Sequence, residues 1–88
     1  MNLKEEFEQA LNQVRSLDTR PSNENLLKLY GLYKQATAGD VRDDRPGGFD
    51  FKAAAKYNVW ISLKGKDKAE AESEYVALVE DLATKYIS

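Results

Sequence analysis

The stretch from Leu26 to Asp40 constrains the fold of this chain more than any other. Its apolar residues recur at the spacing of an α-helix, and four of them share one side: Leu26, Leu29, Tyr30 and Tyr33. Leu27 and Leu32 lie outside this stripe and widen the apolar surface. A helix that is apolar on more than one side usually contacts two things. We therefore expect this helix to contact the protein core and, in addition, a partner or a ligand.

Three more stretches combine helical periodicity with residues that begin or end helices. The predicted helices span residues 2–17, 23–38, 52–64 and 67–86. The expected N-terminal caps are Asn2, Ser22, Asp50 and Asp67. We expect Gly39 and Gly65 to end the second and third helices, because glycine readily adopts the left-handed conformation found there.

The two connections around the second helix differ in length. Residues 18–22 form a short connection, which predicts that the first two helices are antiparallel neighbours. Residues 39–51 hold three of the five glycines and one of the two prolines, and a connection this long can cross a bundle from end to end. In it, we expect Arg45 to face a ligand or to tie the loop down through Asp43 or Asp44. The sequence thus predicts an all-α four-helix fold, one domain over residues 1–88, with a long crossover loop between helices 2 and 3.

Each predicted helix also carries apolar residues for a shared core. On the first helix these are Leu3, Phe7, Leu11, Val14 and Leu17, with Ala10 beside them. On the third helix they are Ala53, Tyr57, Trp60 and Ile61. On the fourth helix they are Tyr75, Leu78, Val79, Leu82 and Tyr86, flanked by Val76. We expect an exposed acidic face on the fourth helix, made by Glu72, Glu74, Glu80 and Asp81.

Composition excludes most kinds of catalytic site. The chain has no cysteine and no histidine, which removes disulfides, thiolate metal sites and the commonest general base. It also removes the Cys–His and Ser–His pairs of nucleophilic enzymes. The Gly47-Gly48 pair is not part of a phosphate-binding loop motif. We therefore predict a protein that is not an enzyme, with no catalytic residue, no metal and no cofactor.

Charge and hydropathy limit the classes of molecule that this chain is expected to bind. The net charge of −2 argues against a nucleic-acid binder. Residues 15–66 carry ten Lys and Arg against six Asp and Glu, whereas the two ends carry three against nine. A basic middle of this kind can receive a compact anion, although scattered solvated charge is the simpler interpretation. There is no signal-peptide region and no apolar run of transmembrane length. We expect a cytoplasmic monomer without a membrane anchor.

Five side chains from three predicted helices suggest a binding site: Tyr30, Tyr33, Lys34, Lys56 and Tyr75. Tyrosine offers a flat face to a base and a hydroxyl to a phosphate, and lysine offers a point charge. Leu26, Leu27 and the alanines of the third helix offer an apolar groove beside them. This set suits a ligand with a phosphorylated nucleotide head and an apolar tail. The simpler alternatives are core tyrosines and, for Lys52 with Lys56, a solvated lysine edge.

Four segments in order resemble the acyl-CoA-binding protein family. The first is Leu26–Asp40, which contains Leu-Tyr-x-Leu-Tyr-Lys-Gln-Ala-Thr-x-Gly-Asp. The others are Arg45-Pro46-Gly47 with Asp50, then Ala55-Lys56-Tyr57 through Trp60 to Leu63-Lys64-Gly65, and finally Ala71 to Tyr75 with Val79 and Leu82. The resemblance implies an up-down-down-up bundle and a non-catalytic carrier of medium- and long-chain acyl-CoA esters, which it would supply to acyl-CoA-using enzymes.

The resemblance also implies roles for individual residues. Lys34 and Lys56 would bind the 3′-phosphate of the CoA ribose, helped by the hydroxyls of Tyr30 and Tyr75. Tyr33 would lie near the adenine, and Arg15 would approach the CoA head from the first helix. The candidates for the acyl groove are Leu26, Leu27, Ala10, Ala55 and Phe7. Phe7 is also expected in the core between the first and fourth helices, together with Val14, Leu17, Val76, Val79 and Leu82.

Three residues depart from the family pattern. Tyr57 stands in place of a tryptophan, Leu11 in place of a small residue that would leave a wider groove, and Ala54 in place of a lysine that would add a phosphate contact. The chain length of the preferred acyl group therefore stays open. Two other functions remain as alternatives: a helical protein–protein interaction module that uses the groove of the second helix, and an acyl-CoA hydrolase, which the missing nucleophile–base pair argues against.

Overall fold

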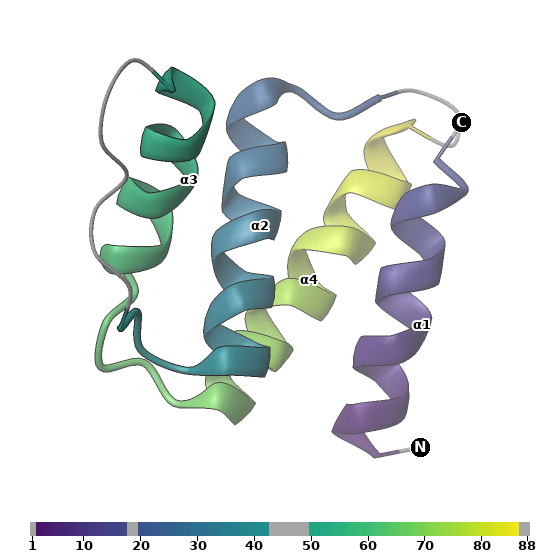
Figure 1. Ribbon diagram of the computed structural model, residues 1–88. Helices are drawn as coiled ribbons and strands as arrows, with labels where there is room; N and C mark the ends of the chain where they lie inside the picture. The colour runs from purple at the N-terminus through teal and green to yellow at the C-terminus, as the bar shows by residue number, and fades with distance from the viewer. Residues whose placement is uncertain (1, 18–19, 43–49, 87–88) are drawn as a thin grey trace.

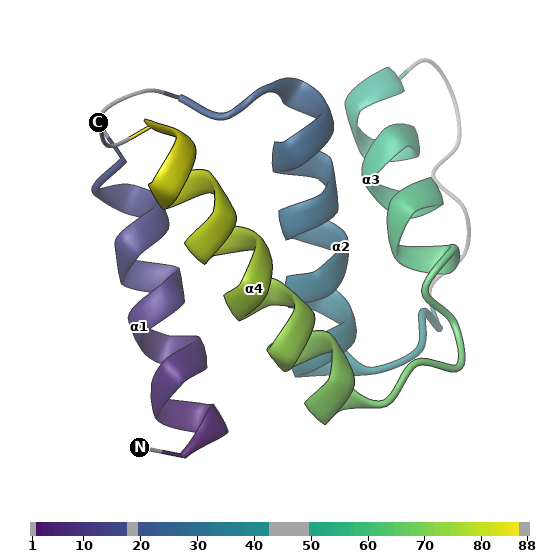
Figure 2. The same cartoon turned by 180° about the vertical axis from the view of Figure 1, so that it is seen from behind.

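The structure, a computed structural model, describes residues 2–17, 20–42 and 50–86. Within these ranges the chain forms four helices and no strand: α1 (Leu3–Arg15), α2 (Asn23–Ala38), α3 (Phe51–Ile61) and α4 (Lys68–Tyr86). Figure 1 shows α1 and α4 running in one direction and α2 and α3 in the other, and Figure 2 shows the same arrangement from behind. The predicted four-helix, up-down-down-up fold is confirmed. The predictions for Asp43, Asp44, Arg45 and the side chain of Tyr86 lie outside what the structure describes.

Polar side chains begin three helices as predicted. Asn2 Oδ1 accepts from Glu5 N at 2.8 Å, Ser22 Oγ from Asn25 N at 3.2 Å, and Asp50 Oδ1 from Ala53 N at 3.0 Å. Each bond satisfies a backbone N–H that has no partner inside its helix. These caps explain why the predicted and observed starts agree to within a residue.

The ends of α2 and α3 differ in how well they were predicted. Gly39 ends α2 at a φ of 81°, as expected. The prediction that α3 extends to residue 64 is wrong, because the α-helix ends at Ile61. Bonds of the tighter i→i−3 type follow, from Leu63 N to Trp60 O at 3.0 Å and from Lys64 N to Ile61 O at 3.1 Å. Gly65, at a φ of 93°, then lies in the turn and not at the helix end.

Helix α4 is the centre of the bundle. It packs against both α1 and α2, whereas α3 packs against α2. The prediction that the first two helices are neighbours is therefore wrong for their backbones: they run antiparallel, with α4 against both (Figures 1 and 2). A short connection fixes the direction of a helix but not which other helix it packs against. Side chains of α4 fill the space between them, among them Tyr75, Val79 and Leu82.

The buried face of α2 is rotated from the predicted stripe. Leu29, Leu32, Gln35 and Ala36 are buried, whereas Leu26, Leu27 and Tyr30 are half-buried and Tyr33 is 40% exposed. Leu32 thus belongs to the core and does not merely widen the apolar surface. Helical spacing alone does not fix which apolar positions face the core when a helix is apolar all round. Of the remaining residues of the predicted stripe, Tyr33 faces α1, whereas Leu26 and Tyr30 face α3.

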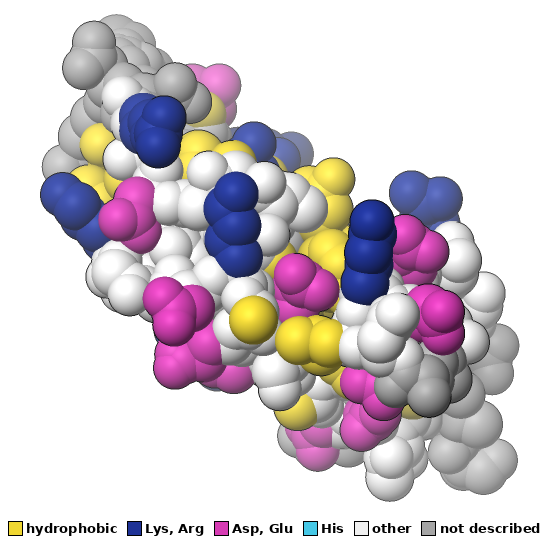
Figure 3. Space-filling model, turned by 90° about the horizontal axis from the view of Figure 1, so that it is seen from below, with side chains coloured by type: hydrophobic (Ala, Val, Ile, Leu, Met, Phe, Trp, Pro, Cys, Tyr) yellow, Lys and Arg dark blue, Asp and Glu magenta, His cyan; other side chains and the backbone are white. Residues whose placement is uncertain are grey.

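Predictions for the other core positions held in part. Phe7, Trp60, Tyr75, Val79 and Leu82 are buried as expected, and Ala10, which was predicted beside the stripe of the first helix, is buried too. Ala71 and Ala83 are also buried, although they were not predicted in the core. Val14, Leu17 and Val76 are partly buried against this core. Ile61 is exposed, contrary to expectation, because α3 packs against a single helix, α2, within the described ranges. Figure 3 views the molecule from below and shows Lys, Arg, Asp and Glu side chains interspersed, with hydrophobic patches between them.

Candidate ligand-binding site

Two lysines cross the interface between α2 and α3. The Lys34 ammonium of α2 lies 4.9 Å from the ring centroid of Trp60 on α3. The Lys56 ammonium of α3 lies 5.2 Å from the ring centroid of Tyr30 on α2. The two residues from each helix are one turn apart, and the helices run in the same direction (Figure 1). The two contacts therefore lie side by side, about 6 Å apart along the helix axes.

The resemblance assigns Lys34 and Lys56 to one phosphate, and both ammonium groups lie over aromatic rings at the α2–α3 interface. In the part of the chain that the structure describes, neither ammonium forms an ion pair; the pairs there are Lys28–Glu24 and Lys66–Glu74. Lys34 and Lys56 are instead held over aromatic rings, whose faces attract a cation. Two positive charges at one interface, with no carboxylate partner among the described residues, favour the binding of an anion.

An apolar pocket of about 460 Å³ lies beside Lys56, whereas Lys34 is not among the residues that line it. Leu26, Leu27 and Ala55, three of the five residues predicted for the acyl groove, line it together with Tyr30, Lys52 and Lys56. Ala10 and Phe7 do not line it, because both are buried in the core on the α1 side. Leu11 also packs against that core, so it does not narrow this pocket.

Sequence reasoning missed three residues of the pocket wall, Arg20, Asn23 and Phe51. Arg20 Nη1 donates to Asn23 Oδ1 at 3.1 Å, which fixes the rim where the chain enters α2. Phe51 is 80% exposed at the start of α3, one turn before Ala55. Its spacing from Ala55 was the available signal, whereas Arg20 precedes the helix and gave none.

Three predicted residues form a second cluster between α1, α2 and α4. The ring of Phe7 stacks on that of Tyr33, with centroids 6.3 Å apart, and meets Tyr75 edge-on at 5.1 Å. Phe7 is buried, which confirms its predicted place in the core. Tyr33 presents an open ring to solvent, as stacking on a flat ligand requires. Because Tyr33 and Lys34 are consecutive on α2, this cluster and the lysine pair are joined through one helix.

Burial changes the chemistry of Tyr75. Desolvation raises the pKa of its phenol, the nearby Tyr33 raises it further, and the positive charge of Arg15 partly opposes both. The hydroxyl therefore stays protonated at neutral pH and remains able to donate a hydrogen bond. Arg15, predicted to approach the ligand head, is thus close enough to Tyr75 to act on its charge.

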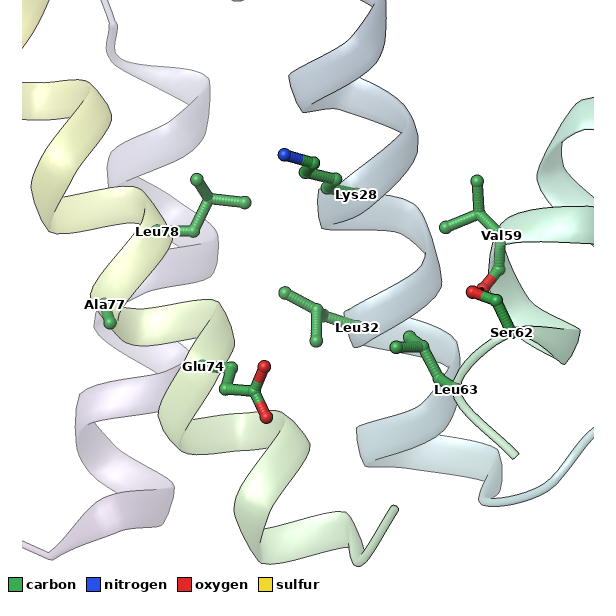
Figure 4. Close-up of a pocket in the computed structure, with 8 residues that line it drawn as sticks. All are labelled: Lys28, Leu32, Val59, Ser62, Leu63, Glu74, Ala77 and Leu78. Atoms are coloured by element: carbon green, nitrogen blue, oxygen red, sulfur yellow. Dashed lines mark hydrogen bonds between the residues drawn. The ribbon is translucent and has the colours of Figure 1, made fainter. Parts of the chain in front are cut away.

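A larger pocket of about 570 Å³ lies on the other side of α2, between α2, α3 and α4 (Figure 4). Lys28 and Leu32 line it from α2, and Lys28 is two residues before Tyr30, hence about 200° around the helix. Its acidic residue, Glu74, already pairs with Lys66. Lys28, its one lining cation, lies near Glu24 at 3.7 Å. The smaller pocket, by contrast, is lined by the three cations Arg20, Lys52 and Lys56.

In the described ranges, no group of three or more acidic side chains could hold a metal ion. None of the described helices has the length and apolar character needed to cross a membrane. The buried polar residue of the core, Gln35, is engaged in structural bonds to Asp40 and to the Lys66 carbonyl.

Known proteins resemble this chain over nearly all of its length. Residues 4–79 match the family model described as "Acyl CoA binding protein". The "Acyl-CoA-binding protein" of Dictyostelium discoideum is 51% identical over 80 residues, which are 91% of this chain and 95% of that protein. The crystal structure of Oryza sativa Acyl-CoA-Binding Protein 2 superposes with a TM-score of 0.90 at 43% identity, covering 96% of this chain and 93% of that one. For the solution structure of the yeast Acyl Coenzyme A Binding Protein the TM-score is 0.73 at 49% identity, with coverage of 93% and 95%.

Proposed function

Because the chain belongs to the acyl-CoA-binding protein family, we propose that it binds medium- and long-chain fatty acyl-CoA esters and transports them without catalysis. The observation that carries this proposal is the crossed pair of lysines on the α2–α3 interface. Lys56 lines an apolar pocket, and the Lys34 contact lies at the same interface one turn further along, so we expect a single amphipathic ligand to contact both cations.

The head of the ligand is held by charge. Lys34 and Lys56 bind the 3′-phosphate of the CoA ribose, and the hydroxyls of Tyr30 and Tyr75 donate to it. A phosphate monoester carries a charge of about −1.5 to −2 at neutral pH, which matches two cations. Tyr33, whose ring is open to solvent, stacks near the adenine, and Arg15 approaches the head from α1.

The tail of the ligand is held by burial. It lies in the pocket whose apolar wall is Leu26, Leu27, Ala55 and Phe51. Each CH₂ removed from water contributes about 0.8 kcal/mol, from which association and ordering costs are subtracted. Of the five predicted groove residues, Ala10 and Phe7 do not line this pocket, so we expect no contact between them and the tail.

Calorimetry with a series of acyl-CoA esters tests this proposal. We expect affinity to increase with chain length, by up to about fourfold per CH₂, until the pocket is full, and then to level off. Equal affinity for free CoA and palmitoyl-CoA would contradict it. Incubation with palmitoyl-CoA should release no thiol, since the chain has neither cysteine nor histidine for a nucleophile–base pair.

A charge variant tests the assignment of the head. Lys34→Ala should weaken palmitoyl-CoA far more than free palmitate, because only the ester carries the ribose phosphate. Lys28→Ala, on the opposite side of α2, is the matched control and should leave both affinities unchanged. Similar losses for the two ligands in Lys34→Ala would rule out the assigned role.

The setting of the protein also belongs to this proposal. We place it in the cytoplasm as a monomer that forms one domain over residues 1–88, and that exchanges acyl-CoA with enzymes that use it. Native mass spectrometry of protein purified from cells tests the ligand and the monomer together. A co-purifying acyl-CoA on a single chain supports the proposal, whereas a bound polypeptide without acyl-CoA would favour the rival interaction module.

A further inference from the structure

We propose that Trp60 is a positioning residue that holds the Lys34 ammonium in place and thereby sets the selectivity of the site for a phosphorylated ribose. This inference rests on the proposed function, since it concerns the same phosphate. We do not expect Trp60 itself to bind the ligand head: the residue is 7% exposed, and it acts through the lysine that lies over its ring.

The ring of Trp60 is fixed from both sides of the interface. Its backbone belongs to α3, and its indole Nε1 donates to the Gly39 carbonyl, at the end of α2, at 2.9 Å. A ring held at its backbone and at its far edge cannot turn away. The Lys34 ammonium, 4.9 Å from the ring centroid, therefore lies against a surface whose orientation is set by the fold.

A cation–π contact restrains a lysine without using it up. An ammonium has three N–H donors, and the ring attracts its charge without requiring a directed hydrogen bond. The donors that point away from the ring remain available for phosphate oxygens. A lysine on an open surface samples many rotamers, and ordering them opposes binding. The ring removes much of that cost before the ligand arrives, which favours the ligand that carries the phosphate.

The Lys56–Tyr30 contact has the same form one turn earlier, but it does not isolate the effect. The Tyr30 hydroxyl is itself assigned to the phosphate, so a change there removes two interactions. Trp60 has no such second role, and it is the single tryptophan of the chain. It therefore offers both the cleaner variant and a fluorescent reporter.

The test compares palmitoyl-CoA with 3′-dephospho-palmitoyl-CoA by calorimetry. The measured quantity is the dissociation constant of the dephospho ester divided by that of palmitoyl-CoA. This ratio reports recognition of the phosphate alone. In Trp60→Leu this ratio should fall about two- to fivefold from the wild-type value, the fold-change that corresponds to one exposed cation–π contact. In Trp60→Phe, which keeps a ring but loses the bond to Gly39, the ratio should stay closer to that of the wild type.

A destabilised control separates positioning from simple loss of structure. Val59→Ala removes packing between α3 and α2 near Gly31 without touching either lysine, and its ratio should equal that of the wild type. A normal ratio in Trp60→Leu, with both ligands weakened alike, would overturn the inference while leaving the proposed function intact. A wild-type protein that does not bind palmitoyl-CoA would instead overturn the proposed function, and this inference with it.

Fluorescence gives an answer that does not depend on the folding of Trp60→Leu. Saturating the wild-type protein with adenosine 3′,5′-bisphosphate should change the emission of Trp60, because the ammonium over its ring acquires a counter-charge. In Lys34→Met at saturation, that change should be lost. An identical emission change in Lys34→Met would show that the lysine does not couple the phosphate to the ring, and would overturn the inference.

Discussion

Gln35 connects the end of α2 to the turn that precedes α4. It is fully buried, and its Nε2 donates to Asp40 Oδ1 and to the Lys66 carbonyl, both at 2.8 Å. Both partners are acceptors, so the amide nitrogen must face them. Its Oε1 is left without a partner among the described residues. Asp40 Oδ1 also accepts from Gly65 N at 2.8 Å, so these side chains join two segments, residues 35–40 and 65–66, that lie far apart in sequence.

Replacing Gln35 tests how much this link contributes to stability. Gln35→Leu keeps the volume but leaves the Asp40 carboxylate and the Lys66 carbonyl without that donor. The free energy of unfolding in urea should fall by about 1–3 kcal/mol. Gln13→Leu, an exposed position on α1, is the control and should change stability by less than about 0.5 kcal/mol. Equal stability of Gln35→Leu and the wild type would show that the link contributes nothing.

Asp40 gives the fold a dependence on pH. Hydrogen bonds from the Gly65 backbone and from Gln35 hold the pKa of its carboxyl below the ordinary value. A carboxyl with a lowered pKa stabilises the folded state above its unfolded-state pKa, and this stabilisation is lost as pH falls through the folded-state pKa. Asp40→Asn should therefore be less stable than the wild type at pH 7, and the difference should shrink between about pH 5 and pH 2. Urea unfolding of both proteins across that range measures it; a difference independent of pH would contradict the assignment.

At the scale of the helices, the interface of α2 and α3 depends on a close approach at Gly31. A Cβ at this position would lie 2.4 Å from Val59 Cγ1 and 3.3 Å from Leu63 Cδ1. Valine has a stiff side chain that cannot swing away at low cost. The helices must therefore separate, or shift, to accept any larger residue. This separation would also change the distances on which the two lysine–ring contacts depend.

A double-mutant cycle tests this packing. Gly31→Ala should reduce stability by about 1–3 kcal/mol, since overpacking a well-filled interface forces backbone shifts. Val59→Ala opens the space again, so the double variant should be less destabilised than the sum of the two single variants. The coupling is measured by urea unfolding of all four proteins. Additive losses would mean that the two side chains do not compete for the same space.

Where the helices begin and end could largely be predicted from sequence, because caps and periodicity depend on residues that are close in the chain. Asn2, Ser22 and Asp50 set the starts of their helices, and Gly39 the end of α2. What could not be predicted depends on packing between helices. Sequence spacing does not reveal that α4 lies against both α1 and α2.

The candidate site, like the fold, could be predicted from sequence only in part. The candidate cations and tyrosines were recognisable from residue type and from the family resemblance. Their pairing was not, because the ring that each lysine contacts lies on the other helix: Trp60 for Lys34 and Tyr30 for Lys56. Contacts of this kind follow from the parallel direction of α2 and α3, which the long crossover permits but whose register it does not specify.

At the scale of the whole molecule, the helices differ in how many neighbouring helices they pack against. Within the described part of the chain, α3 packs against one helix, α2, whereas α2 and α4 each pack against two. Only Trp60 of α3 is buried, while Phe51 and Ile61 at its two ends are exposed. Segments with few buried apolar contacts open at a lower free-energy cost than the core. The pocket proposed for the acyl chain lies between this weakly held helix and the rest of the bundle.

Ligand binding should therefore stabilise α3 more than any other helix. In the free protein, backbone amides of α3 should exchange with deuterium faster than those of α4, because α3 opens without unfolding the core. With palmitoyl-CoA at a hundredfold excess over its dissociation constant, opening becomes costlier by up to about 2.7 kcal/mol, a roughly hundredfold slowing. The tail bridges α2 and α3, so this slowing should be largest in α3 and smallest in α1. Free CoA, which has no tail to bury, is the control and should slow α3 less at equal saturation. Equal slowing of α1 and α3 would mean that the ligand does not lie between α2 and α3, and that the tail is held elsewhere.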